Sequence, residues 1–318
     1  MEAVPMPGPA PGAGRSSWSS CPSGHQPLRR RPVAPWPAMT PSWESLLAAE
    51  RGAGAPVLLV HGQPGSAADW DPVVDVVDGG RTSPRLLVVN RPGYSTSTVG
   101  PASMAGNAQM LADLLVARAA APAVVVGHSY GGGIALLMAA RRPEVVSGLV
   151  LVSAVGLADC VNGFDHMLAL PAIGELLSAA GLFTVGRLLP RMRTLSTRMS
   201  GTLAERLRAT LPDERYGAEL SRSGVRMWRT FVAEQRSLVA EIDDVAAAVS
   251  AVTVPTAVVT GTWDVVVPPA ASAALAAQVP GAELVTLAGV GHFPARDAPR
   301  ALGRAIERTL ERVQRPPR

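Results

Sequence analysis

The run Gly127–Gly131, which reads GHSYG, constrains this chain more than any other part of its sequence. It follows the apolar β-branched residues 124–126 and precedes an alanine- and leucine-rich segment that favours a helix. Glycine at positions 127 and 131 lets the backbone turn sharply, because a Cβ at either position would clash with a neighbouring element. The run therefore predicts a buried strand, a tight turn that carries the hydroxyl of Ser129 over the end of a sheet, and a helix.

Short aliphatic runs alternate with helical runs from about Trp43 onwards. These runs are continuous rather than alternating in polarity, which is typical of a parallel sheet covered on both faces. Strands that alternate with helices predict an α/β fold with a doubly wound, mostly parallel sheet and right-handed crossovers. The expected strands are 57–60, 86–89, 123–126, 149–152, 256–260 and 282–287. The expected helices lie near 68–78, 103–120, 131–141, 269–278 and 298–313.

Residues 157–250 break this alternation, because they contain no convincing strand pattern. Apolar residues recur there at helical spacing, as in Leu203, Leu207 and Leu211 and again in Trp228, Phe231 and Val232. The segment therefore predicts a helical cap inserted into an α/β core of residues 43–156 and 251–318. Since ligands bind at the carboxyl edge of such sheets, we expect the cap to lie over the Ser129 turn.

Residues 1–40 differ in composition from the rest of the chain, because Pro, Gly, Ser and Arg dominate them. Such a segment cannot bury enough apolar surface to offset the entropy lost on ordering, so we expect a disordered tail. The whole chain of 318 residues is 47% hydrophobic, which is enough for one large core or two smaller ones.

The formal net charge is +4, and every basic side chain is arginine because the sequence contains no lysine. The absence of lysine excludes Schiff-base chemistry on a lysine and the lysine of a phosphate-binding P-loop. The arginines are spread over the tail, the middle of the chain and the last expected helix, without the clustering that a nucleic-acid module needs. We therefore expect no nucleic-acid partner.

The two cysteines, Cys21 and Cys160, have neither the spacing of metal ligands nor that of a disulfide framework. No stretch reaches the roughly 18 consecutive apolar residues that would indicate a transmembrane helix. The stretch after residues 29–31 is too short and too rich in proline for a signal peptide. We expect a protein without a membrane span that stays in the cytoplasm, and the sequence does not indicate its oligomeric state.

Ser129 needs a base and an orienting carboxylate, because a serine hydroxyl is a poor nucleophile at neutral pH. Of the five histidines, His292 follows the last expected strand, and its loop should overhang the carboxyl edge of the sheet. Asp264 follows the preceding expected strand and is the favoured acid, with helix capping as its alternative role. Asp159 and Asp297 are weaker candidates.

A tetrahedral intermediate at Ser129 also needs donors for its oxyanion. One should be the backbone N–H of Tyr130, which directly follows the serine. A second must come from another loop, and the glycine-rich turn His61–Gly65 follows the first strong strand. That turn is suited to offer the N–H of Gln63.

These motifs closely resemble the α/β-hydrolase superfamily, in particular its capped branch of esterases, carbon–carbon bond hydrolases and cofactor-independent haloperoxidase-like proteins. The resemblance covers residues 43–313 and implies the same triad and oxyanion roles, but no substrate. It rests on the His61–Gly65 turn with Trp70, Arg91–Ser95, the Ser129 turn, Arg142–Glu144 before Leu149–Val152, Asp264 and His292.

The chain departs from the usual pattern of these relatives at Asn90, where they carry Asp, and at Ser95, where they carry Gly. We interpret both as changes in loop structure. The first hairpin of the fold is also expected to be short, because little chain separates the tail from Val57. Epoxide hydrolases and haloalkane dehalogenases of this branch place Asp at the nucleophile position, so Ser129 argues against both.

The sequence therefore predicts a serine hydrolase that cleaves a carboxylic ester or related acyl bond of a largely apolar small molecule through an acyl-enzyme. No metal or organic cofactor is required. Two alternatives stay open: hydrolysis of a carbon–carbon bond in a diketone-like substrate, and a non-catalytic ligand-binding protein on the same fold. A complete Ser-Asp-His set argues against the second, since a binding protein does not need one.

Overall fold

The computed structural model of the protein describes residues 43–80, 82–211 and 214–315. The predicted tail of residues 1–40 lies outside the described residues. Seven strands form one sheet in the order β1-β3-β2-β4-β5-β6-β7. The strands are β1 (Leu47–Arg51), β2 (Pro56–Val60), β3 (Arg85–Val89), β4 (Ala123–His128), β5 (Val146–Val152), β6 (Thr256–Gly261) and β7 (Glu283–Leu287).

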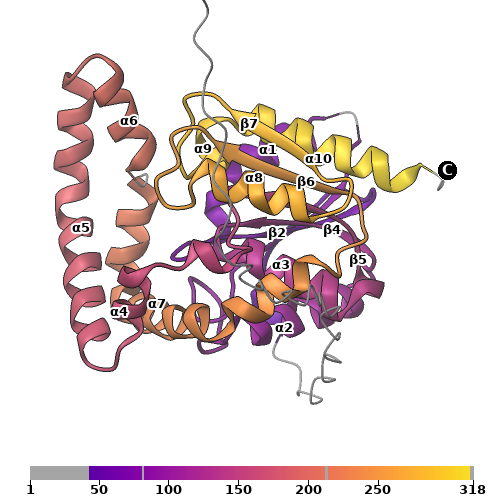
Figure 1. Ribbon diagram of the computed structural model, residues 1–318, viewed down its shortest axis with the longest axis horizontal. Coiled ribbons are helices and arrows are strands. Elements are labelled where there is room, and N and C mark those ends of the chain that lie inside the picture. Colours follow the sequence, from indigo (N-terminus) through magenta and orange to yellow (C-terminus); the bar gives the residue numbers. More distant parts are fainter. Residues whose placement is uncertain (1–42, 81, 212–213, 316–318) are drawn as a thin grey trace, which may run out of the picture. The chain divides into compact units, whose positions relative to one another are not determined.

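Helices cover both faces of this sheet (Figure 1). One face carries α2 (Met104–Ala117), α3 (Tyr130–Arg141) and α8 (Pro269–Gln278), and the other carries α1 (Asp71–Asp78) and α10 (Pro299–Gln314). Neighbouring strands are parallel except that β1 pairs antiparallel with β3. This arrangement confirms the predicted α/β fold with a doubly wound, mostly parallel sheet.

The central strands feed two separate buried clusters, because successive side chains of a strand point to opposite faces. In β2, Leu58 and Val60 belong to the cluster under α2 and α3, whereas Val57 and Leu59 belong to the cluster under α1 and α10. All six residues of β4 are buried. The strand that leads into the Ser129 turn is therefore enclosed on both faces, which fixes the position of the turn.

The sequence pattern did not predict β1, which forms one edge of the sheet. Its sequence is LAAER, and its residues are half-buried or exposed, so it lacks the aliphatic run that marks a covered strand. Tertiary contacts hold it instead. Glu50 of β1 accepts a hydrogen bond from Nε of Arg85 at 2.7 Å and also pairs with Arg118.

Four described helices lie between β5 and β6: α4 (Gly163–Ala169), α5 (Ile173–Arg198), α6 (Thr202–Thr210) and α7 (Glu214–Val249). They form the predicted helical insertion, with α5 at the outer edge and α7 returning to the sheet (Figure 1). The C-terminal half of α7 also contributes to the core, because Leu238, Ile242 and Val245 belong to the buried cluster of α2 and α3. The division into a core and a cap domain at residues 156 and 250 therefore stays a prediction.

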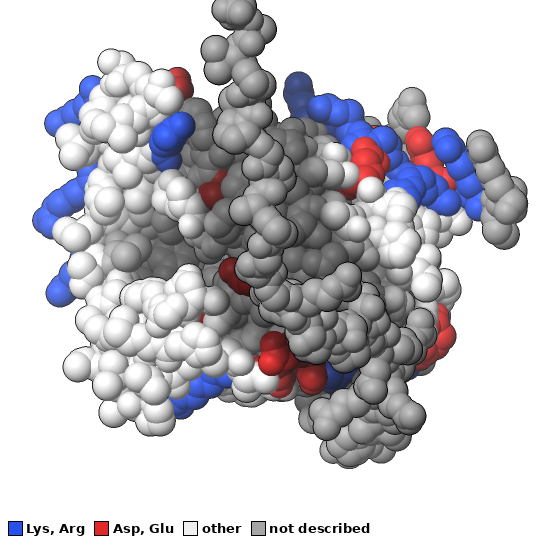
Figure 2. Space-filling model, viewed as in Figure 1, with Lys and Arg blue, Asp and Glu red and all other residues white. Residues whose placement is uncertain are grey.

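Helix α5 packs against α7 and exposes apolar side chains on its outer face. Leu189 is buried, whereas Leu176 is 71% exposed and Leu195 is 58% exposed. No single described helix is long and apolar enough to cross a membrane, and the bent pair Gly163–Ala169 and Ile173–Thr184 meets that test only jointly. Figure 2 shows basic side chains along the outer edge of this region, separated by uncharged residues.

Candidate active site

Ser129 is the single residue between β4 and α3, and its backbone is strained. Its φ of 52° and ψ of −118° lie outside the regions that residues other than glycine usually adopt. A Cβ added to Gly127 would lie 2.3 Å from the carbonyl oxygen of Gly131. A Cβ added to Gly131 would lie 2.5 Å from the carbonyl oxygen of Val60. The structure therefore contains the tight strand–turn–helix that the sequence predicted, and both glycines are required by close backbone contacts.

The two predicted oxyanion donors come from the start of α3 and from the His61–Gly65 loop. Tyr130 is the first residue of α3, so its N–H has no acceptor within the helix. A Cβ added to Gly62 would lie 3.2 Å from Cβ of Ser129, which places the His61–Gly65 loop against the serine. Gln63 follows Gly62 directly in that loop.

Asp264 and His292 meet at the ends of neighbouring strands, as predicted. Nδ1 of His292 lies 2.9 Å from Oδ2 and 3.0 Å from Oδ1 of Asp264. Burial acts to raise the pKa of Asp264, but the hydrogen bond and the charge of His292 lower it below its usual value, so the carboxylate is ionised. Because this carboxylate accepts from Nδ1, that nitrogen carries the proton, and Nε2 is left for a reacting group.

The alternative roles and candidates for the acid do not match the structure. Asp264 does not cap α8, whose N-cap residue is Pro268. Its Oδ1 instead accepts hydrogen bonds from N–H groups of its own loop. Asp297 pairs with its neighbour Arg296 at 2.6 Å, and Asp159 is exposed. Asp264 is thus the carboxylate that the structure brings to His292.

His128 connects the Ser129 turn to the loop of His292. Its Nε2 donates a hydrogen bond to the carbonyl oxygen of His292 at 2.7 Å, and the centroids of the two rings are 4.9 Å apart. Burial, with a smaller effect from His292, lowers the pKa of His128 to about 3, so its ring is neutral at physiological pH. Sequence reasoning gave His128 no role, because its partner lies 164 residues away.

No group of three or more His, Cys, Asp or Glu side chains in the described part of the chain is placed to hold a metal ion. Cys160 is a half-buried free thiol, and Cys21 lies outside the described residues. His128 instead ties the turn of Ser129 to the loop that carries the His292–Asp264 pair. A serine hydroxyl, an imidazole and a carboxylate are the side chains that acyl transfer uses.

A model of the alpha/beta hydrolase family matches residues 57–305, which include Ser129, Asp264 and His292. The chain belongs to the α/β-hydrolase family. It is also similar to an uncharacterised protein of Mycobacterium tuberculosis, with 27% identity over 280 residues, which are 83% of this chain and 77% of that protein.

Two further similar proteins have named activities. The 2-hydroxymuconate semialdehyde hydrolase of a Pseudomonas species is 30% identical over 149 residues, which are 43% of this chain and 50% of that enzyme. The solved structure of a thermophilic esterase from Thermogutta terrifontis has a TM-score of 0.67 at 24% identity, over 84% of this chain and 93% of that chain. The likeness to the esterase structure shows a shared fold.

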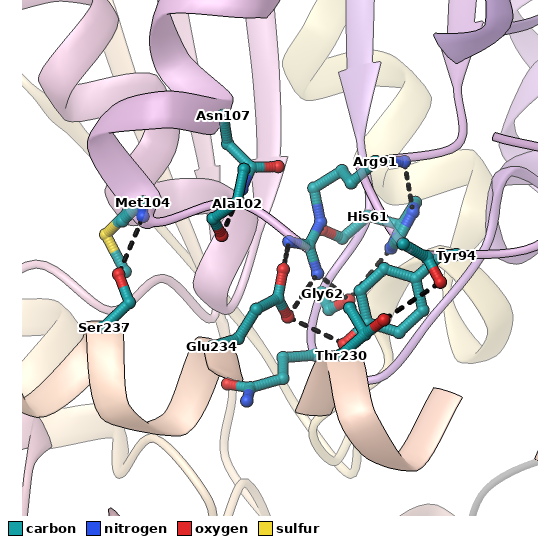
Figure 3. A network of polar contacts seen from close by, with 12 residues as sticks. His61, Gly62, Arg91, Tyr94, Ala102, Met104, Asn107, Thr230, Glu234 and Ser237 are labelled. Carbon is teal, nitrogen blue, oxygen red and sulfur yellow. Dashed lines mark hydrogen bonds and ion pairs between the residues drawn. The ribbon is translucent and has the colours of Figure 1, made fainter. Parts of the chain in front are cut away.

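A fully buried arginine organises the loops beside Ser129 in this α/β hydrolase (Figure 3). Arg91 donates from Nε to the carbonyl oxygen of His61 at 2.9 Å and from Nη2 to that of Gly62 at 2.8 Å. Its backbone N–H donates to Nε2 of His61 at 3.0 Å. Burial and the charge of Arg91 lower the pKa of His61 well below its ordinary value, so this ring is neutral and can accept that bond.

The charge of Arg91 is balanced by Glu234, which comes from the inserted helix α7. Both side chains are 0% exposed, and the guanidinium contacts both carboxylate oxygens. The hydroxyl of Tyr94 donates to Oε2 of Glu234 at 2.7 Å. Burial acts against the charge of Arg91, but the Glu234 carboxylate raises its pKa, so the guanidinium is protonated. Sequence reasoning missed this pair, because the partners are 143 residues apart and no local pattern marks Glu234.

The two departures from the pattern of the relatives have different effects on local loop structure, because Asn90 forms hydrogen bonds whereas Ser95 is strained. Oδ1 of Asn90 accepts from the N–H of Ala67 at 2.8 Å, and its Nδ2 donates to Thr96 at 2.9 Å. Ser95 has a φ of 43°, a left-handed conformation that glycine adopts without strain. Both residues therefore act on the loop after β3, which also carries Arg91.

Proposed function

We propose that this α/β hydrolase is a serine hydrolase that cleaves a carboxylic ester or related acyl bond of a largely apolar small molecule. The observation that supports this most directly is the hydrogen bond from Nδ1 of His292 to Asp264 at 2.9 Å. His128 ties the loop of His292 to the strained turn of Ser129. Such an arrangement activates a serine hydroxyl and has little use in a protein that only binds ligands.

In the proposed reaction, Oγ of Ser129 attacks the carbonyl carbon while Nε2 of His292 takes the hydroxyl proton. Asp264 stabilises the imidazolium that forms, and the N–H groups of Gln63 and Tyr130 bind the oxyanion. The intermediate collapses to an acyl-enzyme as His292 returns the proton to the departing alcohol. Water then attacks the acyl-enzyme by the same steps, which releases the acid and restores the serine.

A fluorophosphonate probe tests the nucleophile directly. We expect covalent labelling of Ser129, no labelling of Ser129→Ala, and a fall in kcat of about 10³–10⁶ for that variant, with little change in Tm. Ser250→Ala, which removes an exposed hydroxyl just after α7, is the matched control and should behave as wild type. An unlabelled wild type, or a Ser129→Ala variant that keeps more than a tenth of the turnover, would contradict the proposal.

Substrate class separates the proposal from its alternatives. The inserted segment is rich in Leu and contains three of the four Phe residues of the chain, so kcat/KM should rise about fourfold for each CH₂ added to the acyl chain of a chromogenic ester, which corresponds to about 0.8 kcal/mol. A flat profile or a preference for charged acyl groups would contradict an apolar site. The likeness to 2-hydroxymuconate semialdehyde hydrolase supports carbon–carbon bond hydrolysis as the second candidate. Turnover of diketones without turnover of esters would favour it.

A further inference from the structure

The peptide group between Gly62 and Gln63 is held from its carbonyl side. The carbonyl oxygen of Gly62 accepts from Nη2 of Arg91 at 2.8 Å and from Nδ1 of His61 at 2.9 Å. The peptide is trans and planar, so the N–H of Gln63 points in the direction opposite to this carbonyl. The contacts that fix the Gly62 oxygen therefore also fix the direction of the Gln63 N–H.

The guanidinium of Arg91 has little freedom to move. Its Nε donates to the carbonyl of His61, and its Nη atoms donate to the carboxylate of Glu234. Its Cζ lies over the rings of Tyr94 and Tyr130, 4.9 Å from the centroid of each ring. The whole side chain is 0% exposed. A cation held at a carbonyl oxygen in a low-dielectric site polarises the peptide group and strengthens its N–H as a donor.

One turn of α7 provides the anchor for both loops. Glu234 binds the guanidinium of Arg91, and three residues earlier the carbonyl of Phe231 accepts from the side-chain amide of Gln63 at 3.0 Å. The hydroxyl of Thr230 donates to the carbonyl of Gly93 at 3.0 Å. Residues at this spacing share one face of a helix, so a single face of α7 contacts both loops (Figure 3).

We propose that Arg91 and Glu234 are positioning residues for oxyanion stabilisation. The carboxylate on α7 holds the guanidinium, the guanidinium orients and polarises the Gly62–Gln63 peptide, and the N–H of Gln63 binds the oxyanion. This inference rests on the proposed function, because an oxyanion forms only during acyl transfer. It makes the inserted helix α7 a support for the transition state rather than for ground-state binding of the substrate.

The test separates kcat from KM in variants of the ion pair. Glu234→Gln keeps the shape of the side chain and removes its charge, and we expect kcat to fall by about 10- to 100-fold while KM changes less than threefold. Removing a whole oxyanion donor costs about 10²–10³ in kcat, which sets the upper limit. The Ki of a boronic acid, which forms a tetrahedral adduct with the serine, should rise by the factor by which kcat/KM falls.

Two further variants keep the test decisive if a lone buried charge impairs folding. Arg91→Met with Glu234→Leu replaces both charges by apolar groups, a change that proteins often tolerate. Tyr94→Phe removes only the hydroxyl bound to Glu234 and should lower kcat by about two- to fivefold. Asp244→Asn is the matched control, because it breaks an exposed ion pair between α7 and α3 at 2.9 Å and should leave kcat and KM unchanged.

The results of these measurements distinguish failure of the inference from failure of the proposed function. Folded variants of the ion pair with kcat within twofold of wild type, or with a rise confined to KM, would overturn the inference and leave the proposed function standing. Loss of kcat in Asp244→Asn equal to that in Glu234→Gln would overturn it too, because any loosening of α7 would then suffice. Absence of ester turnover and of Ser129 labelling in wild type would overturn both proposals.

Discussion

The sheet, whose strand β4 leads into Ser129, and the inserted helices are built in different ways. In the sheet, every residue of β4 is buried, and aliphatic side chains pack on both faces. In α5, Leu189 is buried against the rest of the protein, while Leu176 and Leu195 are mostly exposed. The stability of the sheet region therefore comes from apolar burial on two faces, whereas α5 buries a single face.

Helix α7 belongs to both regions, and this determines how they are coupled. Its C-terminal half packs Leu238 and Val245 into the sheet's buried cluster. Its middle turn instead presents polar groups, among them Glu234, to the loops beside Ser129. Apolar packing fixes where the helix lies, and the buried polar contacts fix its rotation and register, because each polar group loses its partner if the helix shifts. Any influence of the insertion on chemistry should pass through α7 rather than through α5.

We expect the largest effect on kcat from a substitution at the carboxyl ends of the strands, where Asp264 and His292 lie. Asp264→Asn should keep the shape of the site but favour the wrong imidazole tautomer of His292, which lowers kcat by up to about 10⁴. Its Tm should change by only a few degrees, and both quantities can be measured on one sample. Asp297→Asn is the matched control, because Asp297 pairs with Arg296 instead. Activity that survives in the first variant and disappears in the second would move the acid elsewhere.

A pair of leucine truncations measures the difference in packing. Leu151 in β5 is 0% exposed, so Leu151→Ala should lower the free energy of unfolding by about 2–5 kcal/mol through lost burial and a residual cavity. Leu195 in α5 is 58% exposed, and Leu195→Ala should change the free energy of unfolding by no more than about 0.5 kcal/mol. Urea titration gives both values. Equal losses would mean that the outer face of α5 is covered in solution.

The buried imidazole of His128, which joins the Ser129 turn to the loop of His292, should make the stability of the protein depend on pH. The folded state keeps His128 neutral down to a pKa of about 3, whereas the unfolded chain takes up a proton near pH 6.5. The unfolded state therefore binds more protons between these values, and stability falls as the pH decreases, by about 2 kcal/mol from pH 8 to pH 5 for this group.

Replacement of His128 isolates its contribution to the pH dependence of the free energy of unfolding. His128→Gln can still donate to the carbonyl of His292 but does not titrate, so its free energy of unfolding should fall less steeply between pH 8 and pH 5 than that of wild type. Parallel curves for the two proteins, from urea titrations across this range, would show that His128 is already protonated in the folded state.

Local sterics and chain order determined what could be predicted from the sequence alone. The glycines around Ser129 indicated a turn in which no Cβ fits, and the aliphatic runs indicated covered strands. The positions of Asp264 and His292 followed from the same logic, because parallel strands bring their carboxyl ends to one edge of a sheet. These signals lie within a few residues of the features they predict.

The tertiary structure alone decided which distant side chains meet. The edge strand β1 depends on pairing with β3, and LAAER carries no aliphatic run of its own. His128 meets the carbonyl of His292, and Glu234 on α7 meets Arg91, across separations of 164 and 143 residues. Such contacts are set by which faces become buried together. A charged pair persists away from water only when both partners and their hydrogen bonds arrive at once, and that is a property of the whole fold.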